Sequence, residues 1–370
     1  MRREWVRLQL LKLVAHALRP PLSTGRPRPA RLLLIRPDHI GDLLFTTPAL
    51  QLLRETFPTA ETTALVGPWA ATVVERNPNV DIVLKCSFPW FDRRPKPSPW
   101  HPYRVLLREA RRLRRYDFDT VLILRFDHWW GALLSALAGI PVRIGYATPE
   151  TRPFLTTAID YTPDRHAVSH NLALVEALAQ TAGRVVPNIE RRLRFDLTPG
   201  ERAFARQFLA HHGIGSNEIV VGLHPGAGDP SKLWPARRWA AVADRLAEAL
   251  GARIVITGSP AERDLAGTIA GYMRTMPLIA AGETTLGQAA ALLNRCRLVI
   301  GADTGPMHLA VALGVPTVHL YGPFDPALFG PWGSPERHRI VRAPSGRVSD
   351  ITEADVLAAV SATLEATAGK

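Results

Sequence analysis

The sequence predicts an α/β protein made of two successive doubly wound domains, and three observations lead to that prediction. The chain has 370 residues, which is enough for two domains of ordinary size. Short apolar runs of the strand type alternate with segments of helical periodicity, as expected for mainly parallel sheets covered on both faces. A polar, proline-containing stretch over residues 183–200 interrupts this alternation once, and the alternation then restarts.

The first domain is predicted to begin near residue 31. Residues 32–35 form a continuous apolar run, and residues 48–57 show helical spacing, with Pro48 suited to the first turn. Further strands are expected over residues 63–66, 81–84 and 120–124, and a closing helix over residues 166–182.

The second domain repeats this pattern. Strands are expected over residues 219–223, 253–257, 298–300 and 317–320, and helices from residue 235 and over residues 261–272, 286–294 and 306–313. We therefore place the two domains at residues 31–187 and 188–345, followed by a C-terminal helix over residues 346–370. Ligands of such sheets bind beyond the carboxyl ends of the strands. We accordingly expect the domains to face a central cleft that holds the ligand.

Composition excludes several classes of protein. Apolar residues make up 46% and charged residues 21%, which is globular rather than disordered or fibrous. The two cysteines, Cys86 and Cys296, are too few for a disulfide framework or a four-thiolate metal site, and they fit a reducing cytoplasm. No metal-ligand spacing and no recognised nucleic-acid-binding motif is present, so we expect neither a metal nor a nucleic-acid partner.

The net charge of +12 is concentrated in two segments. Residues 1–31 carry eight Lys and Arg against one acidic residue, and residues 93–115 carry nine against one. Residues 1–30 are predicted to form a basic amphipathic helix and a proline-rich tether, a combination that suits an anionic membrane surface. The same helix is consistent with packing on the fold, with a secretory signal or with a start-site artefact.

The second basic segment has arginines at helical spacing. They are Arg108, Arg111, Arg112 and Arg115. Such a helix would present an electropositive face that attracts an anionic, lipid-linked acceptor. An ordinary solvated helix surface has the same pattern, and both interpretations stay open.

The turn after the first strand is the first candidate site. It reads Arg-Pro-Asp-His-Ile-Gly-Asp over residues 36–42. Gly41 lets the backbone approach a ligand closely, and Asp42 could accept a proton from a hydroxyl nucleophile. The alternative is that Asp42 caps the helix that follows.

Two further turns follow strands of the second domain. In the turn over residues 224–235, small residues expose backbone amides, and Lys232 supplies a positive charge where a phosphate would lie. The P-loop pattern is absent there, and the alternative is a packing loop with a solvated lysine. In the turn over residues 301–308, the amides of Gly305, Met307 and His308 are predicted to form an anion cradle at a helix start. Two such turns in one domain indicate a pyrophosphate ligand.

These motifs resemble those of one enzyme family. The run Ile-Arg-Pro-Asp-His-Ile-Gly-Asp, with Thr-Pro-Ala-Leu at 47–50, is similar to the opening signature of glycosyltransferase family nine, the ADP-heptose:lipopolysaccharide heptosyltransferases. His-Pro-Gly-Ala with Lys-Leu-Trp-Pro, then Gly-Ala-Asp-Thr-Gly-Pro-Met-His, then Tyr-Gly-Pro-Phe-Asp-Pro are similar to later family motifs in the same order. The resemblance covers roughly residues 31–345.

The resemblance implies a GT-B fold, in which two Rossmann-like domains face a central cleft and bind the acceptor and the nucleotide sugar, respectively. It implies an inverting, metal-independent transferase without a cofactor, which moves a heptose or related sugar from a donor such as ADP-heptose to a hydroxyl of lipopolysaccharide or another cell-surface glycan. A different nucleotide sugar with another acceptor is the alternative, and a non-enzymatic anion or nucleic-acid binder is a further one. The two cysteines and the basic segment over residues 1–30, which lies outside the resemblance, lead us to expect a cytoplasmic location, peripheral on the inner face of the cytoplasmic membrane.

The resemblance also assigns site residues. Asp42 would be the catalytic base. The donor would be bound by His224, Gly226, Ala227, Lys232, Glu262, Asp303, Thr304, Gly305 and His308. The acceptor would be bound by Arg36, His39, Gly41 and Arg125. Residues 37–40, Pro-Asp-His-Ile, depart from the serine or small residues usual in the family, which leaves open an acceptor other than the lipopolysaccharide inner core.

Overall fold

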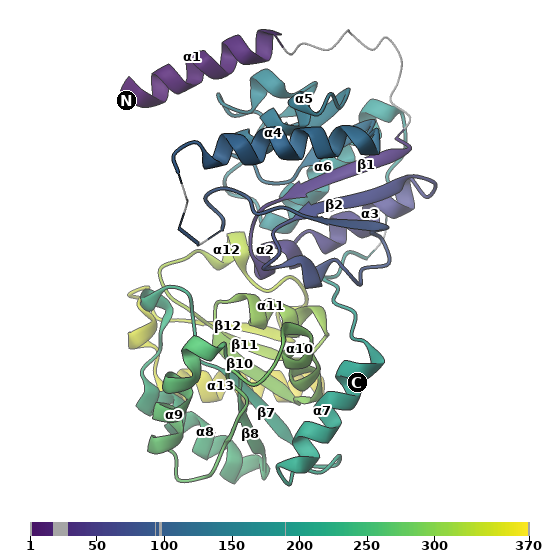
Figure 1. Cartoon of the computed structure of the whole chain (residues 1–370). Helices are drawn as coiled ribbons and strands as arrows, with labels where there is room; N and C mark the ends of the chain where they lie inside the picture. Colours follow the sequence, from purple (N-terminus) through teal and green to yellow (C-terminus); the bar gives the residue numbers. More distant parts are fainter. Residues whose placement is uncertain (1, 18–28, 93, 96–97, 189, 369–370) are drawn as a thin grey trace. The chain divides into compact units, whose positions relative to one another are not determined.

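The structure is a computed structural model that describes residues 2–17, 29–92, 94–95, 98–188 and 190–368. The chain forms two compact units, Met1–Arg191 and Arg192–Lys370, and each is built around its own parallel sheet (Figure 1). Two doubly wound α/β units are what the sequence predicts, so the predicted fold class is confirmed.

The first unit has a parallel sheet of six strands within the described residues, in the order β3-β2-β1-β4-β5-β6. The strands are β1 (Arg31–Arg36), β2 (Glu61–Val66), β3 (Ile82–Lys85), β4 (Thr120–Ile123), β5 (Val142–Tyr146) and β6 (Thr157–Ile159). The helices are α1 (Arg2–Ala17), α2 (Ile40–Leu44), α3 (Thr47–Thr56), α4 (His101–Leu113), α5 (Trp129–Leu137) and α6 (Ala167–Ala182).

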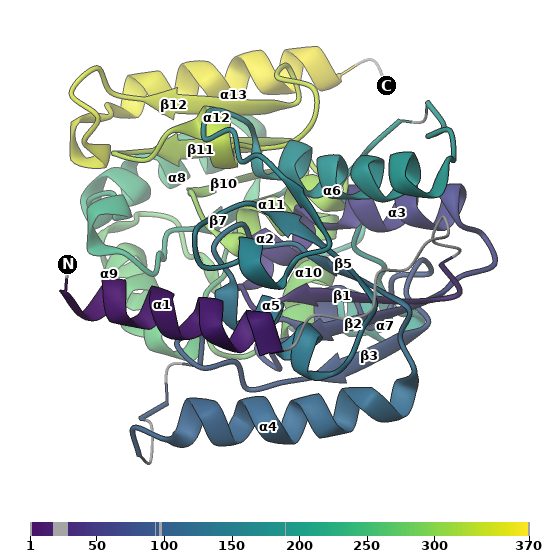
Figure 2. The ribbon, with the colours of Figure 1, turned by 90° about the horizontal axis from the view of Figure 1, so that it is seen from above.

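Both faces of this sheet are buried, which explains the continuous apolar run of β1. Leu33 and Ile35 belong to a core cluster that includes residues of α4 and α5. Leu32 and Leu34 are equally buried and point to the opposite face, because side chains alternate along a strand. Figure 2 shows α4 on one side of the sheet and α3 with α6 on the other.

The second unit has the same strand order relative to its own first strand, β12-β11-β10-β7-β8-β9, counted over its described residues. The strands are β7 (Val220–His224), β8 (Arg253–Ile256), β9 (Leu278–Ile279), β10 (Leu298–Ala302), β11 (Thr317–Tyr321) and β12 (His338–Arg342). The helices are α7 (Pro199–His211), α8 (Ala236–Leu250), α9 (Arg263–Tyr272), α10 (Leu286–Arg295), α11 (Gly305–Ala312), α12 (Pro326–Phe329) and α13 (Glu353–Thr367). Trp234 and Trp239 pack edge to face in its core, with ring centroids 5.1 Å apart.

The strand order fixes where a ligand can bind in each unit. In both sheets the first strand is central, and the chain reverses its direction of growth between the first and fourth strands. Loops leave the carboxyl ends of these two strands in opposite directions and open a crevice there. The turns that matter are therefore those after β1 and β4, and those after β7 and β10.

Several elements went unpredicted because their residues give little local signal. Strands β5, β6, β9 and β12 are short or contain polar residues, and they depend on neighbouring strands for their hydrogen bonds. Helix α7 begins inside the stretch interpreted as a junction. Its start has a capping box in which the Thr198 hydroxyl accepts the Glu201 amide and Glu201 accepts the Thr198 amide.

The N-terminal segment forms α1, so the predicted helix is present, but its apolar residues are not gathered on one face as an amphipathic helix requires. Leu11 and Ala15 are buried in the core of the first unit, whereas Leu13 is 69% exposed. Burial of these two residues favours the packing interpretation of this helix. Residues 18–28, which include most of the tether predicted over residues 20–30, lie outside the described residues. Among the helices that the structure describes, none is long and apolar enough to cross a bilayer.

Candidate active site

The site of the first unit lies where β1 and β4 end. These strands are parallel neighbours, with Ile35 opposite Ile123. Arg36 at the end of β1 therefore lies beside Leu124 and Arg125, which follow β4. The short helix α2 begins four residues after Arg36 and contains Gly41 and Asp42.

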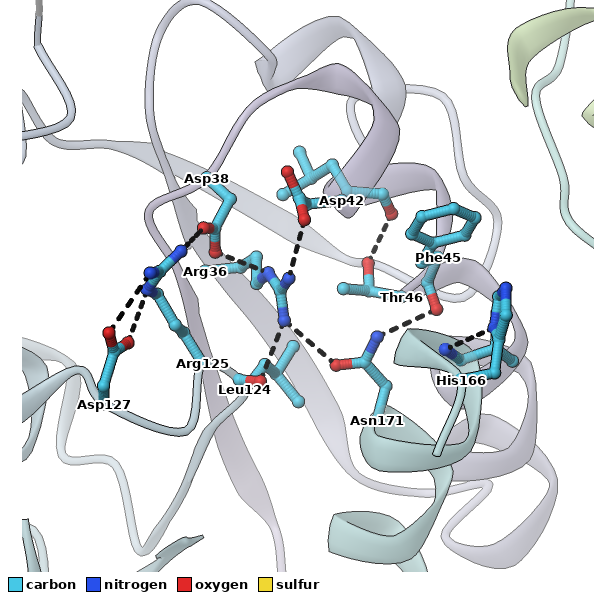
Figure 3. Close-up of polar contacts among 12 residues, drawn as sticks. Arg36, Asp38, Asp42, Phe45, Thr46, Leu124, Arg125, Asp127, His166 and Asn171 are labelled. Carbon is cyan, nitrogen blue, oxygen red and sulfur yellow. Dashed lines mark hydrogen bonds and ion pairs between the residues drawn. The ribbon is translucent and has the colours of Figure 1, made fainter. Parts of the chain in front are cut away.

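Arg36 is the hub of this site (Figure 3). Its side chain is 10% exposed, its Nε lies 2.7 Å from Asp38 Oδ2, and its Nη2 donates to Asp42 Oδ1 at 3.3 Å. Its Nη1 donates to the Leu124 carbonyl at 2.8 Å and to Asn171 Oδ1 at 3.2 Å. A guanidinium with five donors and no acceptor can hold all of these oxygens at once.

Arg125 contacts the second carboxylate oxygen of Asp38. Its Nη1 pairs with Asp38 Oδ1, and its Nε lies 2.6 Å from Asp127 Oδ1. Its guanidinium also lies over the Phe91 ring, 5.1 Å from the centroid. Asp38 is thus held between two arginines, while the Arg125 side chain remains about one-third exposed.

The two carboxylates of this turn differ in their proton affinity. Burial raises the pKa of Asp42, the charge of Asp38 adds to that effect, and the charge of Arg36 opposes it. Burial also acts on Asp38, but the charges of Arg36 and Arg125 outweigh it and hold the Asp38 pKa below its ordinary value. Protein atoms surround much of Asp42, yet it is the more accessible carboxylate of the two, because 33% of its side chain is exposed against 4% for Asp38. An accessible carboxylate with a raised pKa is suited to accepting a proton from a bound hydroxyl group.

Asp42 does not occupy the N-cap of the helix. The N-cap of α2 is His39, and Asp42 lies in the first turn. His39 stacks on Trp69 with centroids 5.9 Å apart, and the Trp69 indole donates to the Asp38 carbonyl at 2.8 Å. These contacts hold the backbone of the turn in place.

Sequence reasoning did not single out Asp38, Asp127 or Asn171 for this site. The Asp38 carboxylate gave a signal, since it lies four residues before Asp42 in the same turn. Asn171 gave none, because it lies in an apolar helical segment far along the chain from Arg36.

The site of the second unit lies where β7 and β10 end. His224 closes β7 and is paired with Gly301 of β10, so the two predicted turns leave the same edge of the sheet. The His224 Nδ1 lies 3.1 Å from the Thr257 hydroxyl. Burial lowers the pKa of His224, so this imidazole is neutral at pH 7.

Lys232 and Asp303 join these two turns. The Lys232 ammonium lies 2.6 Å from Asp303 Oδ2, donates to the Asp303 carbonyl at 3.1 Å, and lies 4.3 Å from the centroid of the Phe324 ring. The Tyr321 hydroxyl donates to Asp303 Oδ1 at 2.8 Å, and His308 Nε2 lies 3.5 Å from the same oxygen. Although burial opposes ionisation, the contacts with His308 and Lys232 hold the Asp303 pKa below its ordinary value. Asp303 therefore remains an anion that orients the lysine.

Glu262 and Gly226 are also brought together. Glu262 Oε2 accepts the Ser259 amide at 2.6 Å within a capping box. A Cβ atom added to Gly226 would lie 2.1 Å from Glu262 Oε1, so glycine is needed for this close approach. Ala227 follows Gly226 and is half-buried.

The anion cradle predicted at α11 needs a correction. Thr304 is the N-cap, and Gly305 is the first helical residue. The amides of Met307 and His308 both donate to the Thr304 carbonyl, at 3.1 Å and 3.3 Å. These two amides are thus used by the helix itself. The positive charge at this position comes instead from Lys232 of the neighbouring turn, which is paired with Asp303.

Known proteins match this chain over most of its length. The family model for glycosyltransferase family 9 (heptosyltransferase) matches residues 106–357. Lipopolysaccharide heptosyltransferase 3 of Escherichia coli is 27% identical over 306 residues, which cover 80% of this chain and 84% of that protein.

Solved structures agree with this match. The crystal structure of the glycosyl transferase family 9 protein from Veillonella parvula DSM 2008 has a TM-score of 0.81 and 27% identity, and covers 92% of this chain and 99% of that one. The E. coli ADP-heptose lps heptosyltransferase II has a TM-score of 0.75 at 24% identity, covering 92% and 100%. The fold is therefore the GT-B type of these enzymes. In the described residues, no group of three or more His, Cys, Asp or Glu side chains could hold a metal ion. The chain belongs to glycosyltransferase family 9, the heptosyltransferase family, and is a glycosyltransferase enzyme.

Proposed function

We propose that this enzyme transfers a heptose or closely related sugar from an ADP-heptose-type donor to a hydroxyl group of lipopolysaccharide or another cell-surface glycan, with inversion at the anomeric carbon and without a metal ion. Two of the relatives named above are lipopolysaccharide heptosyltransferases, and one of these is by its name an ADP-heptose enzyme. The observation that supports the chemistry most directly is the placement of the catalytic groups. Asp42 in one unit, and Lys232 with Asp303 in the other, each lie where the first and fourth strands of their sheet end.

In the proposed reaction Asp42 is the general base. The family match begins at residue 106, so this role rests on the motif and geometry of the first unit. A carboxylate oxygen of Asp42 takes the proton of the acceptor hydroxyl as that oxygen bonds to the anomeric carbon. The bond from this carbon to the donor phosphate oxygen breaks, and its electron pair leaves with the nucleoside diphosphate. A single displacement of this kind inverts the anomeric configuration.

Lys232 would stabilise the departing diphosphate. Negative charge accumulates on the leaving phosphate oxygens in the transition state, so a cation aimed at them lowers the barrier more than it stabilises bound substrate. Asp303 holds the lysine in its orientation before the donor arrives. In the proposal, Lys232 supplies the positive charge that a divalent ion supplies in other transferases. Thr304, Gly305 and His308 border the same position.

Glu262 and the His224–Ala227 turn would hold the nucleoside. A carboxylate accepts two hydrogen bonds from vicinal hydroxyls, which is the pattern that a ribose presents. For this contact Glu262 would exchange its bond from the Ser259 amide for the ribose. Gly226 leaves the space that the carboxylate requires.

His39, Gly41 and Arg125 would contact the acceptor, and Arg36 would act on it through Asp42. Arg125 offers the exposed part of its guanidinium to an anionic group of the acceptor, while Asp38 and Asp127 fix its orientation.

We extend the proposal to peripheral association with the inner face of the cytoplasmic membrane. The outer face of α4, together with the residue that caps its start and the turn that follows it, combines exposed cations with exposed apolar side chains. These residues, here called the α4 face, are Trp100, Tyr103, Arg104, Leu107, Arg108, Arg111 and Arg115. Cations attract anionic headgroups, and tryptophan and tyrosine prefer the headgroup level. This chemistry supports docking next to a lipid-linked acceptor.

The proposal is tested by measuring donor binding and transfer separately. Calorimetric titration with ADP-, GDP- and UDP-sugars should show binding of the ADP-sugar, and transfer to deacylated lipopolysaccharide should follow with the same donor in the presence of EDTA. The product's anomeric configuration, read by NMR, should be opposite to that of the donor. Binding and turnover of a UDP- or GDP-sugar instead would establish the alternative donor, and retention of configuration would overturn the single displacement.

A further inference from the structure

The helix that contains Asp42 depends on other elements for its position. Helix α2 has five residues, too few to be stable by itself. Side-chain hydroxyl groups donate to the carbonyls at its end, where the Leu43 carbonyl also accepts a backbone amide. The Thr46 hydroxyl donates to Leu43 O at 2.6 Å, and the Thr47 hydroxyl donates to Leu44 O at 2.7 Å. Both of these donors are neighbours in sequence.

The next carbonyl, that of Phe45, has a donor from a distant element. Asn171 of α6 donates from Nδ2 to Phe45 O at 2.9 Å, across 126 positions of the sequence. The other end of the same amide, Oδ1, accepts Arg36 Nη1 at 3.2 Å. Figure 3 shows this single side chain between the arginine and the end of the Asp42 helix.

The orientation of the Asn171 amide follows from its partners. A guanidinium can only donate and a backbone carbonyl can only accept, so the oxygen must face Arg36 and the nitrogen must face Phe45. Asn171 is completely buried, so water cannot replace either partner without opening the structure. Rotation of the amide would break both bonds.

The helix that contributes Asn171 is itself anchored to the first unit. The His166 ring accepts the Val168 amide at 3.1 Å and so caps α6, and it packs edge to face on the Phe45 ring at 5.2 Å. The Tyr146 hydroxyl of β5 donates to the His170 carbonyl at 2.8 Å. Asn171 therefore extends from a fixed helix start.

We propose that Asn171 is a positioning residue for Asp42, acting as a neutral clamp between Arg36 and α2. Its oxygen holds the Arg36 guanidinium where Nη2 can reach Asp42. Its nitrogen holds the end of α2, so that the Asp42 carboxylate stays within hydrogen-bond distance of Arg36. Because the amide is uncharged, it fixes Arg36 without competing with Asp38 and Asp42 for the positive charge. The inference rests on the proposed role of Asp42 as general base, but the position of Asp42 can be measured independently of that role.

Two substitutions separate the two functions of the clamp. Asn171→Leu removes both hydrogen bonds and keeps the branching and the number of heavy atoms of the side chain. Asn171→Asp retains an acceptor for Arg36, loses the donor to Phe45, and adds a negative charge that draws Arg36 away from Asp42. Both substitutions should raise the Asp42 pKa. Asn171→Asp should give the larger rise, about one unit above the pKa in the unmodified enzyme. Leu174→Ala, in the same helix and also fully buried, is the control for lost packing.

The experiment uses the full chain and three readings. They are the pH dependence of kcat/KM, the affinity for the donor, and the ¹³C titration of the Asp42 carboxyl in aspartate-labelled protein, assigned by its absence from Asp42→Asn. We expect both Asn171 variants to shift the acidic limb of kcat/KM and the carboxyl titration together towards higher pH. Turnover should fall roughly 10- to 100-fold through misplacement of the base, with donor affinity unchanged. Leu174→Ala should lower the melting temperature and shift neither.

The outcomes test the positioning role of Asn171 separately from the proposed role of Asp42 as general base. If the carboxyl titration stays at its original pH in both Asn171 variants and they resemble Leu174→Ala, Asn171 is merely structural and the inference is wrong. If the titration moves but the limb of kcat/KM does not, Asn171 positions Asp42 and the base assignment fails. The two substitutions differ in charge, so at least one of them is expected to fold. The carboxyl titration and pH profile of that variant can then be compared with those of Leu174→Ala.

Discussion

Lys232 and Asp303, 71 positions apart in the sequence, form an ion pair in which Nζ lies 2.6 Å from Oδ2. The pair links the turn after β7 to the turn after β10, and it places a cation at the edge of the second sheet before any donor is bound. We expect Lys232→Met to weaken donor binding by a factor of roughly 10 to 100, since a charge-assisted hydrogen bond contributes about 1.5–3 kcal/mol. Calorimetric titration with the nucleotide sugar measures this loss.

The control for Lys232 is Lys85→Met. Lys85 forms a surface ion pair with Glu75 at 2.7 Å, and such pairs contribute little. Its donor affinity should equal that of the unmodified enzyme. Unchanged donor affinity together with unchanged kcat in Lys232→Met would remove the lysine from the donor site.

Asp42→Asn should bind the nucleotide sugar normally and lose transfer, because in the proposed function the second unit binds the donor. A general base contributes about 10²- to 10⁴-fold, which sets the expected loss of kcat. In the unmodified enzyme the base must be ionised, and burial raises its pKa. We therefore expect kcat/KM to fall as the pH is lowered through that raised pKa, and to level off above it. Stopped-time assays across pH measure the profile, and full activity of Asp42→Asn would contradict the assignment.

Gly226→Ala should weaken donor binding through Glu262. The new methyl would lie 2.1 Å from Glu262 Oε1, and the carboxylate must move because it is the flexible partner. We expect an affinity close to that of Glu262→Ala, and a double variant no weaker than either single one, because both changes remove the same contact. Titration of all three with donor measures the coupling.

The matched control is Gly267→Ala in α9, where an added Cβ meets nothing within 4 Å. It should leave donor binding unchanged and stabilise the helix by about 0.5–1 kcal/mol. Additive losses in the Gly226→Ala and Glu262→Ala double variant would show that the two residues act separately.

Acid should destabilise the fold through its paired carboxylates. The pKa values of Asp38 and Asp303 are held below the ordinary value of 3.8 by the cationic side chains around them. A lowered pKa contributes stability that is present above the unfolded-state value and is lost as the pH falls through the folded-state value. We expect the free energy of unfolding in urea to decline below about pH 4. Asp38→Asn should be less stable at pH 7 by about 3–5 kcal/mol, because Arg36 and Arg125 lose a buried partner.

Asp42 acts on stability in the opposite direction. Its raised pKa contributes stability that is present at low pH and is lost as the pH rises through that pKa. Asp42→Asn should therefore be at least as stable as the unmodified enzyme at pH 7 despite its lost activity. A clear loss of stability at pH 7 would mean that Asp42 is a structural ion-pair partner of Arg36.

The α4 face is predicted to set the affinity for anionic vesicles. Replacing Arg111 and Arg115 with glutamine should weaken sedimentation with phosphatidylglycerol vesicles roughly 30-fold, at about 1 kcal/mol for each cation. Turnover of a soluble acceptor should be unaffected. Arg184→Gln, which changes an exposed arginine elsewhere in the first unit, is the control.

Removal of residues 1–29 should weaken vesicle binding further. It should also destabilise the unit, because the core loses the buried side chains of Leu11 and Ala15. Equal vesicle binding by all variants would exclude the α4 face as a docking surface.

Local patterns in the sequence were enough to predict two doubly wound units and the turns that contain the site residues. Continuous apolar runs such as that of β1 arise because both faces of a parallel sheet are buried, and this cause acts residue by residue. The turns after β1, β7 and β10 could be predicted for the same reason, since the runs before them mark where each strand ends. Strands β5 and β9 escaped prediction because pairing with neighbours, rather than their own residues, stabilises them.

Only the tertiary structure determined which groups of the site contact one another and in which direction their pKa values shift. From the sequence, Asp38 and Asp42 are two carboxylates in one turn, and their different pKa values arise only when Arg125 closes on Asp38 and burial acts on Asp42. The use of the Met307 and His308 amides within α11, and the clamp formed by Asn171, likewise depend on atoms that meet in space. Periodicity records which face of an element is buried, whereas hydrogen bonds and charges act over a few ångströms between groups whose separation in sequence is arbitrary.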